Sequence, residues 1–242
     1  MSLLFISDLH LDPKRPAITQ AFYAFLDTTA KDIEALYILG DFFETWLGDD
    51  DDTPLYLEVI TQLKNYTDSG TAVYFMHGNR DFLIGEHFAQ QAGVSLIKDP
   101  SLIDYQGQQY LLLHGDSLCT KDNEYMQFRA KVRSPQWQQE VLSKTLEQRR
   151  NYAKELRQQS QAMTSLKAED IVDVSSEAVI DIMRQYNVNS LIHGHTHRPN
   201  THPLTIDNKS AQRTVLGDWG ELGWYIQLTK DTLSLKSFNI PS

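Results

Sequence analysis

Short apolar runs alternate along the chain with amphipathic segments. The runs LLFIS, ALYILG, AVYFMHG, YLLLHG and SLIHG have the length and the β-branched or aromatic content of buried strands. Helical spacing over residues 16–30 and 54–69 separates expected strands near 3–6, 35–39 and 71–76, a β-α-β-α order. Later, TVLGDW, WYIQL and TLSLKSF follow closely, as in hairpins. The pattern predicts an α/β chain with an α+β sandwich: two mixed β-sheets packed face to face and flanked by helices.

The segment at about residues 120–170 differs from its surroundings. It is glutamine-rich, with helices expected over residues 123 to about 133 and again from Ser134 and Pro135 onward, where serine caps and proline takes the first helical position. It carries 10 Lys and Arg against 7 Asp and Glu, whereas the remaining residues carry 12 against 25. With 242 residues and 41% hydrophobic content, we expect a single domain over residues 1–242 with a helical insertion.

Charge and cysteine content restrict the class of protein. A net charge of -10 argues against broad nucleic-acid binding, which requires Lys and Arg to neutralise phosphates. Cys119 is the only cysteine, so no intramolecular disulfide is possible, and we expect it to be a small buried apolar residue rather than a nucleophile. The chain shows neither a signal peptide nor an apolar run of about 20 residues, so we expect it to be neither secreted nor membrane-spanning.

Each apolar run is followed by residues that can bind metal ions. The clusters are Asp8-Leu9-His10, Gly40-Asp41, Gly78-Asn79-Arg80-Asp81, His114-Gly115-Asp116 and Gly194-His195-Thr196-His197. Two divalent cations about 3.5–4 Å apart can clamp a phosphoryl group, and such a pair needs a bridging carboxylate. Asp41 is the bridging candidate, because glycine before it allows a tight turn and a close approach to the ions.

The remaining donors are mixed in chemistry. Oxygen and imidazole donors would come from Asp8, His10, Asn79, His114, His195 and His197. This mixture suits manganese, iron or zinc better than calcium or magnesium. The alternative is that these residues are scattered turn Asp and Asn and structural histidines. We expect the other histidines to pack in the interior or lie at the surface: His77, His87, His193 and His202. Of these, His77 and His193 flank ligand clusters and are near enough to support the ligands.

In this order the clusters D-x-H, GD, GN-x-D, HGD and GHTH resemble the calcineurin-like metallophosphoesterase superfamily over essentially the whole chain. Most members carry a histidine after the asparagine, commonly assigned to protonate the leaving oxygen. Here Arg80 stands in that position, and arginine cannot release a proton. GNRD, with FISDLHL, YILGDFFETWLGDDD, LLLHGDSLCTKDNEYMQFR and GHTHRP, is similar to the UDP-2,3-diacylglucosamine diphosphatase family of lipid A synthesis.

The resemblance implies a reaction and a set of roles. The pyrophosphate bond of UDP-2,3-diacylglucosamine would be hydrolysed to UMP and 2,3-diacylglucosamine 1-phosphate (lipid X), by metal-bridged hydroxide attacking the phosphorus nearer uridine, with two divalent ions, usually Mn²⁺. One ion would be held by Asp8, His10, Asp41 and His197. The other would be held by Asp41, Asn79, His114 and His195. The implied catalytic residues are Asp41, Asn79, Arg80, His114 and His195. The implied substrate contacts are Asn79, Arg80, Asp122, Ser160, Thr164, Lys167 and His195.

Independently of the family, the Arg80 guanidinium matches phosphate oxygens, although a salt bridge to Asp81 or Asp116 is the alternative. The lipid substrate implies peripheral attachment to the cytoplasmic face of the bacterial inner membrane, without an obligate protein partner. The insertion is then either a lid with an acyl-binding inner face and basic residues near phosphates or the membrane, or an ordinary solvated helical pair packed on the core.

Two other functions are weighed against the lipid-linked substrate. One is another calcineurin-like phosphoesterase acting on phosphodiesters or phosphomonoesters. The other is a non-catalytic scaffold, which the intact ligand set disfavours. The acidic run at residues 49–52 lacks the spaced ligands of a calcium loop, and we expect a solvated turn there.

Overall fold

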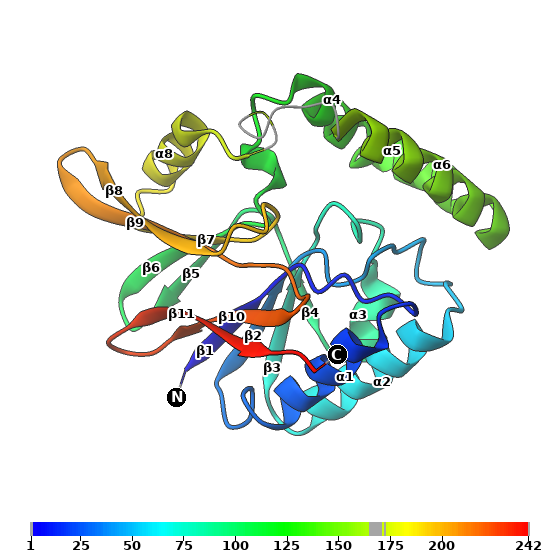
Figure 1. Cartoon of the computed structure of the whole chain (residues 1–242), viewed down its shortest axis with the longest axis horizontal. Helices are drawn as coiled ribbons and strands as arrows, with labels where there is room; N and C mark the ends of the chain where they lie inside the picture. The colour runs from blue at the N-terminus through cyan, green and yellow to red at the C-terminus, as the bar shows by residue number, and fades with distance from the viewer. Residues whose placement is uncertain (1, 165–170, 172, 242) are drawn as a thin grey trace.

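Two mixed sheets form the centre of the computed structural model, which describes residues 2–164, 171 and 173–241 (Figure 1). The first sheet has the order β11-β10-β1-β2-β3-β4, with β1 to β4 parallel and the other two antiparallel. Its strands are β1 (Leu3–Ile6), β2 (Ala35–Leu39), β3 (Ala72–Met76), β4 (Ser95–Ile97), β10 (Leu222–Leu228) and β11 (Leu233–Asn239). The second has the order β5-β6-β7-β9-β8. Its strands are β5 (Ser101–Tyr105), β6 (Gln108–Leu112), β7 (Ser190–His193), β8 (Asn200–Ile206) and β9 (Lys209–Val215).

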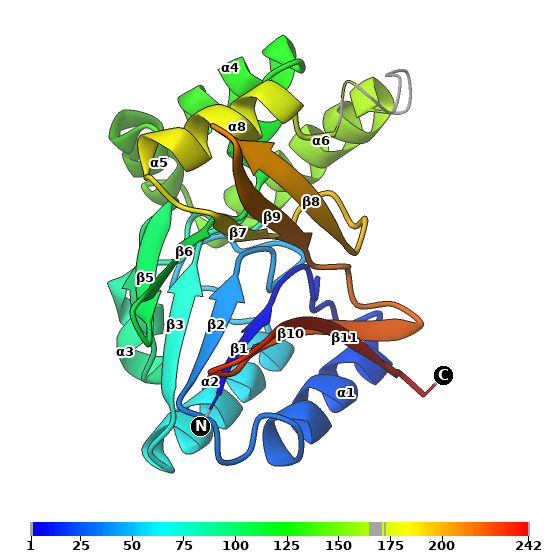
Figure 2. The same ribbon diagram turned by 90° about the vertical axis from the view of Figure 1, so that its left-hand side faces the viewer.

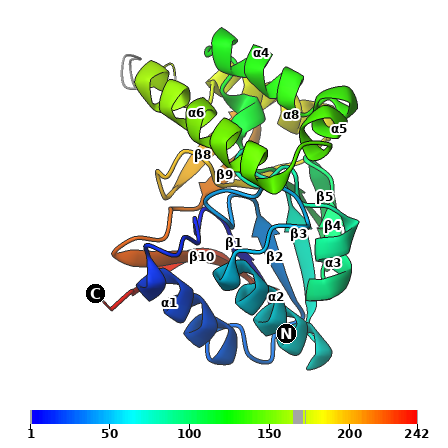
Figure 3. The ribbon, with the colours of Figure 1, turned by 90° about the vertical axis from the view of Figure 1, so that its right-hand side faces the viewer.

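Helices cover the outer face of each sheet. The first sheet packs on α1 (Pro16–Asp27), α2 (Pro54–Asp68) and α3 (Glu86–Ala92), as Figure 3 shows. The second packs on α8 (Ser176–Gln185) (Figure 2). On β1, Leu4 and Ile6 contact the helical layer, whereas Leu3 and Phe5 face the second sheet. Both faces are buried, which is why these strands are continuously apolar. The predicted two-sheet sandwich with flanking helices is confirmed.

One predicted strand is shorter than expected. The run TVLGDW continues β9 only to Val215, after which the chain crosses from the second sheet to the first. There the Trp219 amide donates to the Asp8 carbonyl at 3.0 Å, and its fully buried indole packs against Phe25. Tertiary packing of this large side chain therefore outweighs the strand propensity of the run.

Three helices lie together above the ends of the strands, and we call them the cap (residues 123–164; Figure 1). They are α4 (Asn123–Val132), α5 (Pro135–Leu142) and α6 (Leu146–Thr164), preceded by the short helix η1 (Asp116–Leu118). As the sequence predicts, Ser134 caps α5 by accepting from the Trp137 amide, and Pro135 stands in the first turn. A lid motion of the cap stays a prediction.

The acidic run at residues 49–52 forms a turn in which Asp50 and Asp52 are exposed, as expected, but Asp51 is buried and the run also pairs with α6. Arg149, only 3% exposed, pairs with Asp50 and donates to the Leu47 carbonyl. Arg150, the next residue of α6, pairs with Asp51 and Asp52. The acidic residues are thus the anchor of α6, a contact between segments about a hundred residues apart that no local pattern reveals.

Replacing Arg149 by alanine should lower the free energy of unfolding by about 1–3 kcal/mol, because the buried Leu47 carbonyl loses its donor. The measurement is urea unfolding followed by circular dichroism. The control is Arg184→Ala, which removes an exposed pair with Asp207 and should change the free energy of unfolding far less. Equal losses in the two variants would contradict an anchoring role for Arg149.

Candidate metal centre

The loops that follow β1, β2, β3, β6 and β7 meet at one end of the two sheets. Backbone hydrogen bonds join them sideways: the Asp8 amide donates to the Gly40 carbonyl at 3.1 Å, and the Gly194 amide donates to the His114 carbonyl at 2.9 Å. The loops also approach closely, since a Cβ atom at Gly78 would collide with the Asp41 carboxylate. Rigid strands therefore bring all five predicted clusters to one place.

Strained backbone marks the same residues. Five of the seven predicted ligands have φ between 49° and 69°: Asp8, His10, Asp41, His195 and His197. Non-glycine residues in this left-handed region cost of order 1–3 kcal/mol each and persist where the surrounding structure enforces them, most often at functional sites. The strain here turns carboxylates and imidazoles toward a common centre instead of into the sheets.

The first group of side chains consists of Asp8, His10 and His197, with one donor atom of each within 4.8 Å of the others. His10 Nε2 lies 3.3 Å from His197 Nε2, which in turn lies 3.4 Å from Asp8 Oδ1. Asp8 Oδ2 accepts from Ser7 Oγ and from the His195 amide, whereas Asp8 Oδ1 is buried without a hydrogen-bond partner. An unsatisfied carboxylate oxygen beside two imidazole nitrogens suits a cation.

The second group consists of Asp41, His114 and His195, again within 4.8 Å. His114 Nε2 lies 2.9 Å from Asn79 Oδ1 and 3.6 Å from Asp41 Oδ1. His114 Nδ1 lies 2.8 Å from the Leu39 carbonyl, which orients the ring and leaves Nε2 toward the centre. Asp41 faces both groups, because its Oδ2 lies 3.9 Å from His10 Nε2. The two groups are two candidate metal sites that share one carboxylate.

The electrostatics of the centre favour positive charge. Burial alone would lower the pKa of His114, but the carboxylates of Asp41, Asp116 and Asp8 raise it to about 9. Burial would raise the pKa of Asp8, yet the neighbouring imidazoles, His197 first among them, hold it well below its usual range. His195 behaves differently, since burial and His114 lower its pKa to about 4. Asp8 thus stays ionised and attracts protons or cations.

Arg80 forms neither of the salt bridges weighed as alternatives. Its Nε is buried without a hydrogen-bond partner among the described residues. Both expected alternatives are occupied elsewhere: Asp81 accepts from the Phe42 and Gly78 amides, and Asp116 is bonded by Arg129. The guanidinium lines a pocket beside Asn79.

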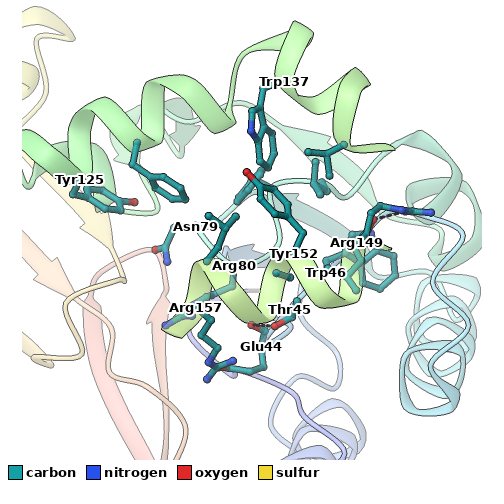
Figure 4. A pocket seen from close by; sticks show the side chains of 17 residues that line it. Glu44, Thr45, Trp46, Asn79, Arg80, Tyr125, Trp137, Arg149, Tyr152 and Arg157 are labelled. Carbon is teal, nitrogen blue, oxygen red and sulfur yellow. Dashed lines mark hydrogen bonds and ion pairs between the residues drawn. The ribbon is translucent and has the colours of Figure 1, made fainter. Parts of the chain in front are cut away.

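That pocket, of about 150 Å³, lies between the cap and the strand ends (Figure 4). Its polar side is formed by residues next to the candidate metal sites: Glu44, Asn79, Arg80 and Arg157. Its apolar side comes largely from the cap and from the loops that follow β2 and β3: Trp46, Leu47, Phe82, Leu83, Phe128, Trp137, Val141, Tyr152 and Leu156. A ligand with a charged end and a hydrocarbon end matches this division.

The remaining predicted substrate contacts are placed less completely. Asp122 caps α4, where its side chain accepts from the Tyr125 amide at 3.0 Å. Ser160 and Thr164 belong to α6, but their side chains lie outside what the structure describes, and Lys167 lies outside the described residues altogether. Their roles stay predictions.

Several side chains around the centre have no signal in the sequence. Tyr125 donates to Asp116 at 2.8 Å, and its ring stacks on His195 with 6.1 Å between centroids. Arg129 donates to the same Asp116 oxygen, so α4 is fastened to the loop after β6. The only available hint is the spacing of Tyr125 and Arg129, four residues apart on one helical face. Glu44, three residues after Asp41, is another such residue.

Neither Cys119 nor the remaining buried histidine is a candidate nucleophile or ligand. Cys119 is buried, and burial together with Asp116 raises the pKa of its thiol to about 12, so it stays protonated as the sequence predicts. His193 is fully buried, and its Nδ1 lies 2.8 Å from the Gly194 carbonyl. Among the helices that the structure describes, none has the length and apolar character needed to span a membrane.

Comparison with known proteins gives concordant matches. The model of the calcineurin-like phosphoesterase family matches residues 1–199. The chain is 51% identical over 240 residues to a UDP-2,3-diacylglucosamine hydrolase of Cellvibrio japonicus, covering 99% of this chain and all of the relative. It is also 51% identical over 228 residues to the protein of the same name from Pseudomonas aeruginosa, covering 94% and 95% of the two chains. A solved archaeal phosphodiesterase, 12% identical, shares the fold with a TM-score of 0.50 over 99% of each chain.

Proposed function

Since the chain belongs to the calcineurin-like phosphoesterases and, within them, to the UDP-2,3-diacylglucosamine hydrolases, we propose that it hydrolyses the pyrophosphate bond of UDP-2,3-diacylglucosamine in lipid A biosynthesis. The observation that supports this most directly is that two candidate metal sites lie beside a pocket with an apolar wall. The metal sites suit the pyrophosphate, and the apolar wall suits the acyl chains. The products are UMP and 2,3-diacylglucosamine 1-phosphate.

We assign one ion to Asp8, His10, Asp41 and His197 and the other to Asp41, Asn79, His114 and His195, with Mn²⁺ as the preferred metal. The donor set fits such ions, because Asp8 Oδ1 lacks a partner and the imidazole nitrogens face one another. When bound, a pair of divalent cations neutralises charge on phosphate oxygens and activates water at neutral pH. We propose that water attacks the phosphorus nearer uridine, so that the bond between this phosphorus and the bridging oxygen breaks.

The chain's own residues contribute binding and orientation. Arg80 lines the pocket and would offer its guanidinium, whose Nε has no partner among the described residues, to the phosphate group, where developing charge is stabilised most if water is excluded. Arg80 carries no releasable proton, so it acts through its charge and hydrogen bonds rather than as an acid. The cap supplies the apolar wall, and with it a surface from which water leaves when acyl chains bind.

We further propose peripheral attachment to the cytoplasmic face of the inner membrane. A lipid-linked substrate has to be reached at a bilayer surface, and no helix among those described could span the bilayer. The segment over residues 120–170 carries more Lys and Arg than Asp and Glu, and Lys or Arg near an anionic surface contribute about 1 kcal/mol each. Its charge therefore favours the approach of the cap side to the membrane.

Purified protein supplied with Mn²⁺ should release UMP and the acylated sugar phosphate from UDP-2,3-diacylglucosamine, separated by chromatography. Chelation by EDTA should stop the reaction and Mn²⁺ should restore it. Faster turnover of soluble aryl phosphodiesters or phosphomonoesters than of the lipid-linked nucleotide would overturn the substrate assignment and favour another phosphoesterase.

Replacing Asp41 by alanine should weaken both ions at once and abolish turnover, because its two oxygens face the two groups. Metal content is measured by mass spectrometry after gel filtration. The control is Asp68→Ala, which removes an exposed carboxylate that pairs with Lys64, away from the ligand groups. A variant that keeps two ions and a comparable rate would show that Asp41 does not bridge.

Replacing Arg80 by alanine should leave the metal content unchanged and lower kcat/KM by about 10²–10³, or about 2.7–4 kcal/mol, if it acts like an oxyanion donor. Arg80→Lys keeps the charge without the planar guanidinium, and its kcat/KM should lie between those of the unmodified protein and Arg80→Ala. Loss of metal from the alanine variant would instead make Arg80 a support for the ligands.

A further inference from the structure

Both ring nitrogens of His10 face acidic groups. Nε2 points toward Asp8 and Asp41, 3.9 Å from an oxygen of each. Nδ1 lies 2.9 Å from Glu44 Oε2, and the side chains of His10 and Glu44 are only 9% and 13% exposed. Glu44 follows β2 and stands three residues after Asp41. A carboxylate on the second nitrogen of a ligating histidine fixes the ring and its tautomer.

The other oxygen of Glu44 leaves this loop and meets the cap. Glu44 Oε1 pairs with the guanidinium of Arg157 on α6, and Figure 4 shows both side chains at the edge of the pocket. Glu44 therefore contacts a predicted metal ligand with one oxygen and a cap helix with the other. Arg129 and Asp116 tie α4 to the loop after β6, so the Glu44 pair is a separate tie between α6 and the loop after β2.

We propose that Glu44 is a positioning residue that holds His10 toward the first ion and, through Arg157, couples occupation of that site to the docking of α6 over the pocket. The proposal rests on the ligand assignment of the proposed function. If His10 binds an ion through Nε2, the proton belongs on Nδ1, and Glu44 Oε2 stands 2.9 Å from that nitrogen, in an ion-pair contact rather than an aligned hydrogen bond. Coupling of this kind is reciprocal: an ion that steadies Glu44 steadies α6, and a docked α6 improves ion binding.

A matched control lies on the same helix. Arg150, seven residues before Arg157 and two turns away, pairs with Asp51 and Asp52. Among the described residues neither of those carboxylates pairs with a predicted ligand, and Arg150 does not line the pocket. Arg150→Gln therefore removes a cap ion pair of the same chemistry without touching His10.

The first test measures Mn²⁺ binding to the full chain, with free Mn²⁺ counted by electron paramagnetic resonance. Glu44→Gln should weaken one of the two ions by about 10–100-fold and leave the other unchanged. Glu44→Asp should recover part of the loss, and Arg150→Gln should bind as the unmodified protein does. Unchanged affinity for both ions in Glu44→Gln would overturn the proposal, as would an equal loss at both sites, which indicates general disruption.

The second test measures hydrogen exchange of residues 146–158 in α6 with and without Mn²⁺. Mn²⁺ should slow exchange there in the unmodified protein and in Arg150→Gln, but much less in Arg157→Gln, whose loss leaves the Glu44–His10 contact in place. Equal protection in Arg157→Gln would overturn the coupling. A different result would contradict the proposed function itself: an unmodified protein that binds no ions or releases no UMP.

Discussion

Attraction between cations and two groups of carboxylates and imidazoles is, in our proposal, the interaction on which the rest of this structure depends. The groups share Asp41, whose two oxygens lie 3.6 Å from His114 Nε2 and 3.9 Å from His10 Nε2. Asp8 Oδ1 is buried without a hydrogen-bond partner, and five of the predicted ligands have a left-handed backbone that costs free energy. The two sheets can be understood as a frame that keeps these side chains together against that cost.

Three levels of structure serve this centre. Apolar strands buried on both faces fix the loops, and hydrogen bonds such as the one that His114 Nδ1 donates to the Leu39 carbonyl fix the rings. The cap then covers the pocket, and its contacts with the loops around the centre include Asp116 below α4 and Glu44 below α6. In our proposal, binding of the acylated substrate and arrangement of the metal ligands involve the same charged contacts, which would couple the two.

The sequence predicts the frame and the composition of the centre well, because both are local signals. Each apolar run ends in a ligand cluster, so strand and candidate ligand are identified together, as at β2 and Asp41. Contacts between distant segments are not predictable in this way: Arg149 reaches Asp50, and Trp219 leaves its expected strand for the core. Ser160, Thr164 and Lys167 came from family resemblance alone, and the described structure does not test them.

The central claim is that one protein chain holds two ions on either side of Asp41. Crystals grown with Mn²⁺ and measured at the manganese absorption edge test it most directly, since anomalous scattering locates the ions without assumptions about ligands. Two peaks about 3.5–4 Å apart, both within coordination distance of Asp41, are expected. A single peak, or peaks remote from Asp41 and the four histidines, would contradict the account.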